Sequence, residues 1–136
     1  MLHSLFPHPS TEFLMAKMSI YKEFKFDAAH RLPCVDAEHK CGNLHGHTFV
    51  LEVHLTGTVD PTYGWILDFN ELRFAVNPII KQLDHAMLNE IEGLENPTSE
   101  NLAVWFWKQL KPKLSQLSKI VIKESPTSGC IYCGDD

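Results

Sequence analysis

The stretch from His45 to Thr56, HGHTFVLEVHLT, alternates between two kinds of side chain at every step. In a β-strand, successive side chains point to opposite faces of the sheet, so residues two apart share a face. One face carries two histidines followed by an apolar stripe: His45, His47, Phe49, Leu51, Val53 and Leu55. The other face is mostly small or polar. We therefore predict a strand, over about residues 44–59, that aims two imidazoles at one point beside a buried stripe.

The segment before this strand, at about residues 19–31, repeats the alternation. One of its faces carries Ile20, Phe24, Phe26, Ala28 and His30, with Lys22 as its only charged member. If the two segments pair as antiparallel strands, His30 joins His45 and His47 at the end of the shared stripe. Three histidines with an open fourth position form the ligand set of a catalytic zinc rather than a structural one.

Other interpretations of these residues stay open. Histidines two apart in a strand are often ordinary, partly buried groups, and it is the matching position of His30 that favours a metal site. The turn between the strands carries Cys41, either as a further ligand or as a nearby reactive thiol. His54 falls on the polar face and is expected to be solvated. His39, in loop-like sequence, is assigned no role.

Composition indicates one globular domain. The chain has 136 residues, 44% of them hydrophobic, and a chain of this size buries about 68–70% of its unfolded surface. The formal net charge is −5 and no basic stripe is present, so nucleic acid is not an expected partner. No apolar run approaches the roughly 18–20 residues that span a bilayer, so no membrane partner is expected either.

The N-terminus and the cysteines bear on location. Residues 1–17 are expected to be a flexible extension, with residues 18–136 as a single catalytic domain. The extension has no basic n-region and no continuous apolar h-region, so we expect a cytoplasmic protein with reduced thiols. Cys130 and Cys133 match CxxC spacing, but one such pair at a chain end is weak support for a metal site, and we interpret it as incidental. Cys34 is interpreted as a bystander.

The remaining elements follow from helix caps and periodicity. Asp68 to Glu71 resembles a capping box before a helical run in which Pro78 should produce a kink. A second helix is expected to begin at 97–100 and to bury Ala103, Phe106, Trp107, Leu110 and Leu114. Strands are expected over about 117–125 and 129–134. The predicted fold is α+β, β-β-α-α-β-β, with a four-stranded antiparallel sheet and two helices on one face. Its open edges and uncovered face indicate an oligomer.

Two polar groups allow two interpretations each. Asp84 could orient the imidazole of His85 for acid–base work, but spacing alone favours an exposed helix end, where the dipole stabilises a histidine. Glu124 ends the apolar stripe of its strand, after Ile120 and Ile122. It is either paired there, for example with two N–H groups of a flat heterocycle, or simply solvated.

Five ordered motifs carry a resemblance to a known family. They are FDAAHRL at 26–32, CGNLHGH at 41–47, LDH at 83–85, NPTSEN at 96–101 and KESPTSGC at 123–130. Together they resemble the 6-pyruvoyltetrahydropterin synthase superfamily, more closely its bacterial branch, the 6-carboxy-5,6,7,8-tetrahydropterin synthases of queuosine biosynthesis. The resemblance covers about residues 19–136. The chain departs from the bacterial branch in its N-terminal extension and in Cys34 and Cys133.

The resemblance implies a tunnelling fold (T-fold), in which subunits join their sheets into a barrel, usually a trimer, and two trimers stack into a homohexamer. It implies the substrate 7,8-dihydroneopterin triphosphate and the products 6-carboxy-5,6,7,8-tetrahydropterin, acetaldehyde and triphosphate. Two alternatives stay open. One is a 6-pyruvoyltetrahydropterin synthase that does not cleave the side chain, and the other is a non-catalytic zinc- or pterin-binding protein.

The resemblance also implies residue roles. Zn²⁺ would be held by His30, His45 and His47. Cys41 would be the proton-transferring base, Asp84 with His85 the second acid–base group, and Glu124 the anchor of the pterin ring. Thr98, Ser99 and Glu100 match a segment that a neighbouring subunit contributes near the pocket.

Overall fold

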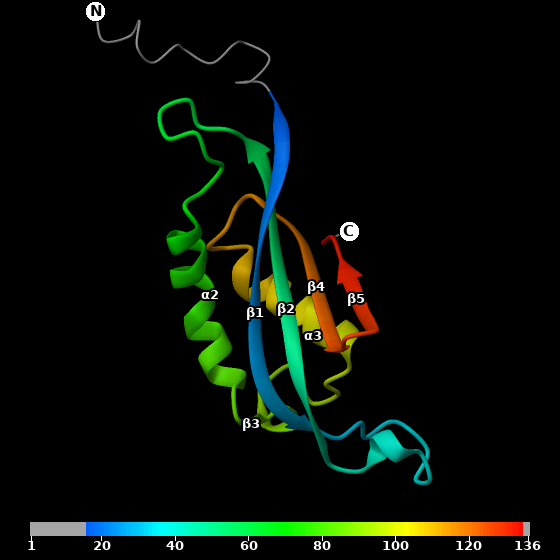
Figure 1. Ribbon diagram of the computed structural model, residues 1–136. Helices are drawn as coiled ribbons and strands as arrows, with labels where there is room; N and C mark the ends of the chain where they lie inside the picture. Colours follow the sequence, from blue (N-terminus) through cyan, green and yellow to red (C-terminus); the bar gives the residue numbers. More distant parts are fainter. Residues whose placement is uncertain (1–15, 135–136) are drawn as a thin grey trace, which may run out of the picture.

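Two long strands form the spine of the structure (Figure 1). β1 (Lys17–His30) and β2 (His45–Thr58) pair antiparallel along their whole length. The structure is a computed structural model that describes residues 16–134. The expected flexible extension lies outside the described residues as far as residue 15, and Lys17 already belongs to β1. The register sets His30 opposite His45, as the two apolar stripes predicted.

The sheet has five strands rather than the four predicted, in the order β3-β1-β2-β4-β5. β4 (Leu117–Ser125) and β5 (Ser128–Tyr132) are the two C-terminal strands expected from the sequence, and both pairings they make are antiparallel. The additional strand is β3 (Ala86–Met87), which pairs parallel with β1. Two residues are too few to show a period, so this strand left no pattern in the sequence.

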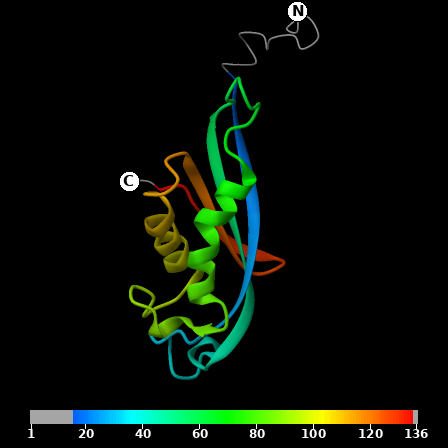
Figure 2. The same ribbon diagram turned by 90° about the vertical axis from the view of Figure 1, so that its left-hand side faces the viewer.

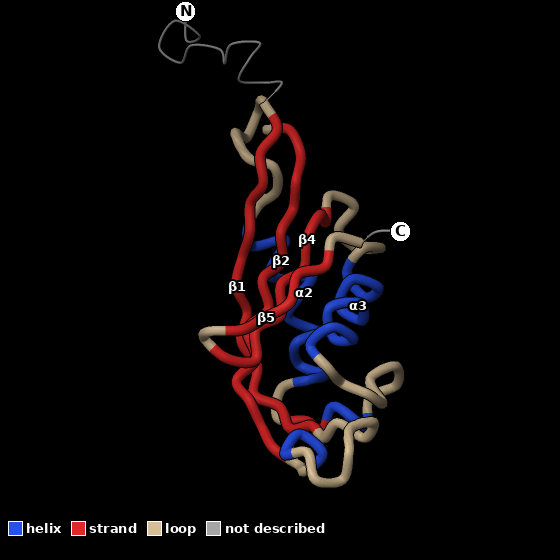
Figure 3. Tube along the Cα trace, turned by 90° about the vertical axis from the view of Figure 1, so that its right-hand side faces the viewer, coloured by secondary structure: helices blue, strands red, loops and turns tan. Residues whose placement is uncertain are grey.

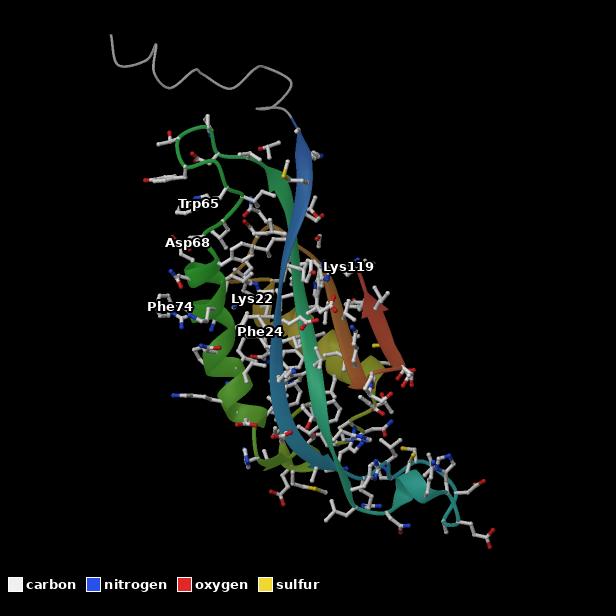
Figure 4. The ribbon with its side chains drawn as sticks, in the orientation of Figure 1. Lys22, Phe24, Trp65, Asp68, Phe74 and Lys119 are labelled. Atoms are coloured by element: carbon white, nitrogen blue, oxygen red, sulfur yellow. The ribbon has the colours of Figure 1, made fainter. Side chains whose placement is uncertain are left out.

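The helices begin where the caps predicted. Asp68 caps α2 (Phe69–Leu83) by accepting a hydrogen bond from the Asn70 N–H. Thr98 caps α3 (Ser99–Leu110) by accepting one from the Asn101 N–H. α2 continues through Pro78 to Leu83, so the proline does not divide the helix. Figure 4 marks Asp68 at the start of α2 and Phe74 on its outer side.

The second helix ends earlier than predicted, and short 3-10 turns complete the chain. α3 stops at Leu110, two residues before Pro112, because proline has no N–H to continue the helical hydrogen bonds. Leu114 is still buried, but from the loop after the helix. The 3-10 turns are η2 (Lys40–Gly42) and η3 (Leu88–Glu90).

Both helices pack on the same face of the sheet. Figures 2 and 3 show this from the left-hand and the right-hand side of the view in Figure 1. The core between them contains side chains with no exposed surface, including Phe49, Leu51, Leu55, Leu72, Leu83, Leu102, Phe106 and Ile120. The predicted α+β class with two helices on one face is therefore confirmed. Among residues 16–134, no helix combines the length and the apolar character needed to cross a membrane.

The uncovered face of the sheet holds a polar cluster that corrects the expectation for His54. This side chain is only 13% exposed. Its Nε2 lies 2.8 Å from Oε1 of Glu52, and its ring stacks on Tyr21. The other carboxylate oxygen of Glu52 lies 3.2 Å from Nζ of Lys123. His54 was expected to be solvated because alternation identifies the face of a side chain but not its neighbours across the strands.

This cluster predicts a pH-dependent contribution to stability. Burial would raise the pKa of Glu52, but the hydrogen bond from His54 and the contacts with Lys123 outweigh it and lower the pKa below its usual 4.5. The stabilisation is therefore present above pH 4.5 and is lost as the pH falls through the lowered folded-state value. We expect Glu52→Gln to reduce the free energy of unfolding at pH 7 by on the order of 1 kcal/mol.

Urea unfolding of both proteins between pH 3 and 7 measures this contribution. The difference between wild type and Glu52→Gln should shrink below pH 4.5. A difference that stays constant across this range would mean that the charge of Glu52 does not stabilise the fold.

Candidate functional site

Three histidines meet where β1 ends and β2 begins. His30 is the last residue of β1, while His45 and His47 are the first and third residues of β2. One nitrogen from each imidazole lies within 4.8 Å of those of the other two. His30 is almost completely buried, with 1% of its surface exposed. The cluster predicted from the two apolar stripes is thus present.

Carbonyl groups behind the rings fix which nitrogen of His30 and His45 is free. Nδ1 of His30 donates to the Pro97 carbonyl at 2.8 Å, and Nδ1 of His45 donates to the Asn43 carbonyl at 2.7 Å. In a neutral imidazole whose Nδ1 carries the proton, Nε2 presents a lone pair. This arrangement is typical of metal ligands, whose second nitrogen is held by a backbone carbonyl or a carboxylate.

The Nε2 atoms face one another in a way that suits a cation. Those of His30 and His45 are 3.1 Å apart. Nε2 of His47 is buried and has no hydrogen-bond partner among residues 16–134. Two lone pairs in contact and a third buried without a donor are costly unless a positive charge lies between them.

The charge state and the spacing also fit a metal. Burial is the main factor that lowers the pKa of His30, against the opposing hydrogen bond to Pro97. The neutral form, which is the one that binds metal, is therefore favoured. Nitrogens of a tetrahedral zinc site are about 3.3 Å apart at bond lengths of about 2.0–2.1 Å. The 3.1 Å between Nε2 of His30 and Nε2 of His45 is close to this spacing, so the three imidazoles could hold such an ion.

Cys41 is not part of the cluster. It is the middle residue of η2, in the loop that joins β1 to β2, and its side chain is partly exposed. The group of potential ligand atoms within 4.8 Å contains the three histidines and not this thiol. Of the two interpretations left open by the sequence, the geometry does not support Cys41 as a ligand.

Asp84 and His85 do form a pair, contrary to what their spacing favoured. Oδ2 of Asp84 lies 3.1 Å from Nδ1 of His85, and Oδ1 accepts a hydrogen bond from the Asp27 N–H at 2.9 Å. The bond from Asp27, followed by that from His85, holds the pKa of Asp84 below its usual range. The carboxylate therefore stays charged and can orient the imidazole.

The strained backbone of His85 supports a functional role for the Asp84–His85 pair. His85 has φ of 61°, which makes it the only non-glycine residue with positive φ among residues 16–134. Its N–H donates to the Asp27 carbonyl at 2.6 Å, so Asp27 of β1 holds both residues, Asp84 through its N–H and His85 through its carbonyl. The His85 side chain is 80% exposed. A strained residue held this firmly, with an exposed imidazole, is typical of functional sites.

Glu124 lines a cavity of about 280 Å³. Its Oε1 accepts a hydrogen bond from the Ser99 hydroxyl at 2.7 Å, and its Oε2 lies 3.9 Å from Nε2 of His47. Glu124 is therefore held beside the histidine cluster rather than simply solvated. Its carboxylate keeps acceptor capacity for a ligand, because only one oxygen is bonded to Ser99.

The same chain supplies the rest of this cavity. Thr98, Ser99 and Glu100 line it together with Glu124 and Cys130. The sequence resemblance assigned the segment 98–100 to a neighbouring subunit, but here it already lies beside Glu124 of its own chain. Cys130 donates to the Ser99 carbonyl at 3.3 Å, and burial, followed by the charge of Glu100, raises the pKa of its thiol. Cys133 is exposed.

The acid–base pair and Glu124 line different cavities within one chain, and His47 and Thr48 line both the cavity of His85 and a third cavity with Glu124. A second cavity, of about 570 Å³, is lined by His85 together with Asp27, Gly46, His47 and Thr48. Glu124 does not line it, and His85 does not line the cavity of Glu124. The two lie towards opposite edges of the sheet, because β1 and β2 run between β3 and β4.

Comparison with known proteins defines the class of this fold and site. Residues 19–135 match the family described as 6-pyruvoyl tetrahydropterin synthase, and the chain belongs to that family. It is 40% identical over 119 residues to the 6-carboxy-5,6,7,8-tetrahydropterin synthase of Synechocystis, covering 83% of this chain and 91% of that protein. It is 39% identical to the dihydroneopterin monophosphate aldolase of Pyrococcus furiosus, covering 72% and 79%.

A solved structure confirms the fold. The 6-pyruvoyl tetrahydropterin synthase of Caenorhabditis elegans superposes with a TM-score of 0.83 at 34% identity, covering 89% of this chain and 98% of that one. The chain therefore has the T-fold predicted from its motifs, and its relatives are named as pterin enzymes.

Proposed function

We propose that this protein is a zinc-dependent lyase that converts 7,8-dihydroneopterin triphosphate to 6-carboxy-5,6,7,8-tetrahydropterin, acetaldehyde and triphosphate, a step of queuosine biosynthesis. The observation that carries the proposal is the convergence of three histidine Nε2 atoms beside the carboxylate of Glu124. The similarity to the Synechocystis enzyme supports this choice of substrate and product.

The geometry supports a role for each of these residues. His30, His45 and His47 would hold the zinc, which when bound supplies a Lewis acid for the hydroxyl oxygens of the substrate side chain. Glu124 would accept hydrogen bonds from the N–H groups of the pterin ring, with Ser99 holding its carboxylate in place. Thr98 and Glu100 would contact the same ring from the cavity wall.

Two groups would move protons. The Cys41 thiolate would remove a proton from a side-chain carbon, and triphosphate would leave by elimination. His85, oriented by Asp84, would return and accept protons during the retro-aldol type cleavage that releases acetaldehyde. The two groups are placed on different elements, η2 and the turn after α2, so each can serve a different carbon.

Product identification tests this function. Incubation with 7,8-dihydroneopterin triphosphate should release acetaldehyde and 6-carboxytetrahydropterin. A 6-pyruvoyl product without acetaldehyde would instead identify the pyruvoyl synthase reaction. The monophosphate should be assayed in parallel, because the Pyrococcus furiosus relative is named as a monophosphate aldolase. Binding of zinc and pterin with no turnover of either substrate would favour the non-catalytic alternative.

We also propose a homohexamer, a dimer of trimers, as the active form. Along β1, only Ala28 and Ala29 pair with β3, so within residues 16–134 most of that edge pairs with no further strand. β5 forms the opposite edge. Joining β5 of one subunit to β1 of the next would close a barrel and remove both edges. It would also bring His85 of one subunit towards the Glu124 cavity of its neighbour.

This assembly has a direct prediction. Light scattering should give about six times the chain mass of 15.5 kDa. Mixing the Cys41→Ala and His85→Ala variants, after dissociation and reassociation, should recover part of the activity, because some mixed sites contain both intact residues. A monomer with full activity would contradict the proposal, and so would a mixture that stays inactive.

The pterin anchor gives another prediction. We expect Glu124→Ala to weaken pterin binding by about 1.5–3 kcal/mol, the range for hydrogen bonds to charged groups, with zinc content unchanged. Ser99→Ala should weaken it by less, because the carboxylate remains. Fluorescence titration with neopterin measures both, with Glu71→Ala on the exposed side of α2 as a control. Unchanged affinity in Glu124→Ala would exclude it as the anchor.

A further inference from the structure

His39 holds the turn that carries Cys41. It is the N-cap of η2, and its Nδ1 accepts a hydrogen bond from the Cys41 N–H at 3.0 Å. The backbone of His39 belongs to the same turn, since its N–H donates to the Asp36 carbonyl and its carbonyl accepts from the Gly42 N–H, both at 2.9 Å. His39 is exposed, but this one hydrogen bond ties its imidazole to the turn.

Cys41 is held on its other side by β1. Its carbonyl accepts a hydrogen bond from the Leu32 N–H at 2.9 Å. Leu32 lies two residues after His30, so this bond ties the turn to the strand end that carries the histidine cluster. Both polar groups of the Cys41 backbone are thus fixed, one by Leu32 and the other by His39. Figure 1 shows this loop (cyan) beyond the ends of β1 and β2.

The turn needs such a side chain because it is short. The first N–H groups of any helix lack partners within it, and a three-residue turn has no later hydrogen bonds to compensate. Asp, Asn, Ser and Thr are the usual residues that accept from the second helical N–H, which here is that of Cys41. An imidazole can replace them only as the neutral tautomer that carries its proton on Nε2 and accepts at Nδ1.

We propose that His39 is a positioning residue for Cys41. By holding the Cys41 N–H while Leu32 holds the carbonyl, it fixes the direction of the Cα–Cβ bond and so the place of the thiol beside the histidine cluster. Without the imidazole, the Cys41 N–H loses its partner, although the backbone hydrogen bonds of the turn remain. This inference rests on the proposed function for the role of Cys41 as the base, but the anchoring itself does not depend on that role.

Three variants of the full-length, zinc-loaded protein test the inference. His39→Ala removes the acceptor. His39→Asn replaces it with a side chain that can accept from the same N–H. Glu38→Ala alters the preceding exposed residue, for which no side-chain contact is present in the described part of the chain, and serves as the control. The measurements are amide hydrogen exchange at Cys41, zinc content, neopterin affinity, kcat and KM.

In His39→Ala we expect the Cys41 amide to exchange about tenfold faster and kcat to fall by about 10- to 100-fold, since a misplacement of about 1 Å can cost that much. KM, zinc content and neopterin affinity should stay near those of the wild type. His39→Asn should restore slow exchange and most of kcat, while Glu38→Ala should change neither.

Each other outcome overturns the assignment. Unchanged exchange in His39→Ala would mean that the imidazole does not hold the turn. Faster exchange with unchanged kcat would mean that the turn need not be held, and slow exchange without recovery of kcat in His39→Asn would give the imidazole another role. If the wild type turns over neither pterin phosphate, the proposed function fails, and the exchange data alone still decide whether His39 anchors Cys41.

Discussion

The His45→Ala variant should retain almost no zinc and almost no activity. A three-histidine site that loses one ligand keeps two, whereas a tetrahedral catalytic zinc site needs three protein ligands. The loss should be especially large at this position, because the Nε2 atoms of His45 and His30 are in contact and the Asn43 carbonyl already fixes the His45 ring. We expect zinc to fall from about one ion per chain to a trace.

A matched control is available on the same strand. His54 lies on the opposite face of β2 and bonds to Glu52, so His54→Ala removes an imidazole without touching the cluster. Metal analysis after gel filtration should show full zinc in His54→Ala and a trace in His45→Ala, with similar circular dichroism for both. Full zinc in His45→Ala would mean that the ligands have been assigned wrongly.

The histidine cluster could be predicted because it depends on the alternation of side chains between the two faces of a strand. Alternation sets His45 and His47 on one face, and the matching stripe of β1 ends at His30. Two apolar stripes that bury against the same helices cannot pair one residue out of register, since a shift of one residue would turn every side chain to the other face. The starts of the two helices could also be predicted from the sequence. Each cap residue, Asp68 or Thr98, accepts a hydrogen bond from an N–H no more than three residues later.

The rest of the site depends on contacts between distant residues that leave no local pattern. The Asp27 backbone holds Asp84 from 57 positions away, and the Ser99 hydroxyl holds Glu124 from 25 away. The turn at His85 needs positive φ, which is uncommon outside glycine, and the sequence around His85 carries no pattern that predicts it. Only the cap at His39 was local enough to be found, and it was missed because histidine is not among the usual N-cap residues.

The Cys41→Ala variant should separate catalysis from binding. The thiol lies outside the group of histidine ligand atoms, so its removal should leave zinc content at the wild-type level. Glu124 and Ser99 are also untouched, so pterin affinity should be retained. Loss of a general acid–base group typically costs about 10²–10⁴-fold in rate, and we expect a fall of that size in kcat.

His85→Ala should show the same combination of retained zinc, retained pterin affinity and lost turnover, because proton transfer fails when either group is missing. Cys34→Ala, an exposed cysteine in the same connecting loop, is the matched control and should keep full activity. Zinc content, neopterin affinity and product formation should be measured on all three proteins. If Cys41→Ala loses its zinc, the cysteine is a ligand after all. If it keeps full turnover, the base of this reaction is another residue.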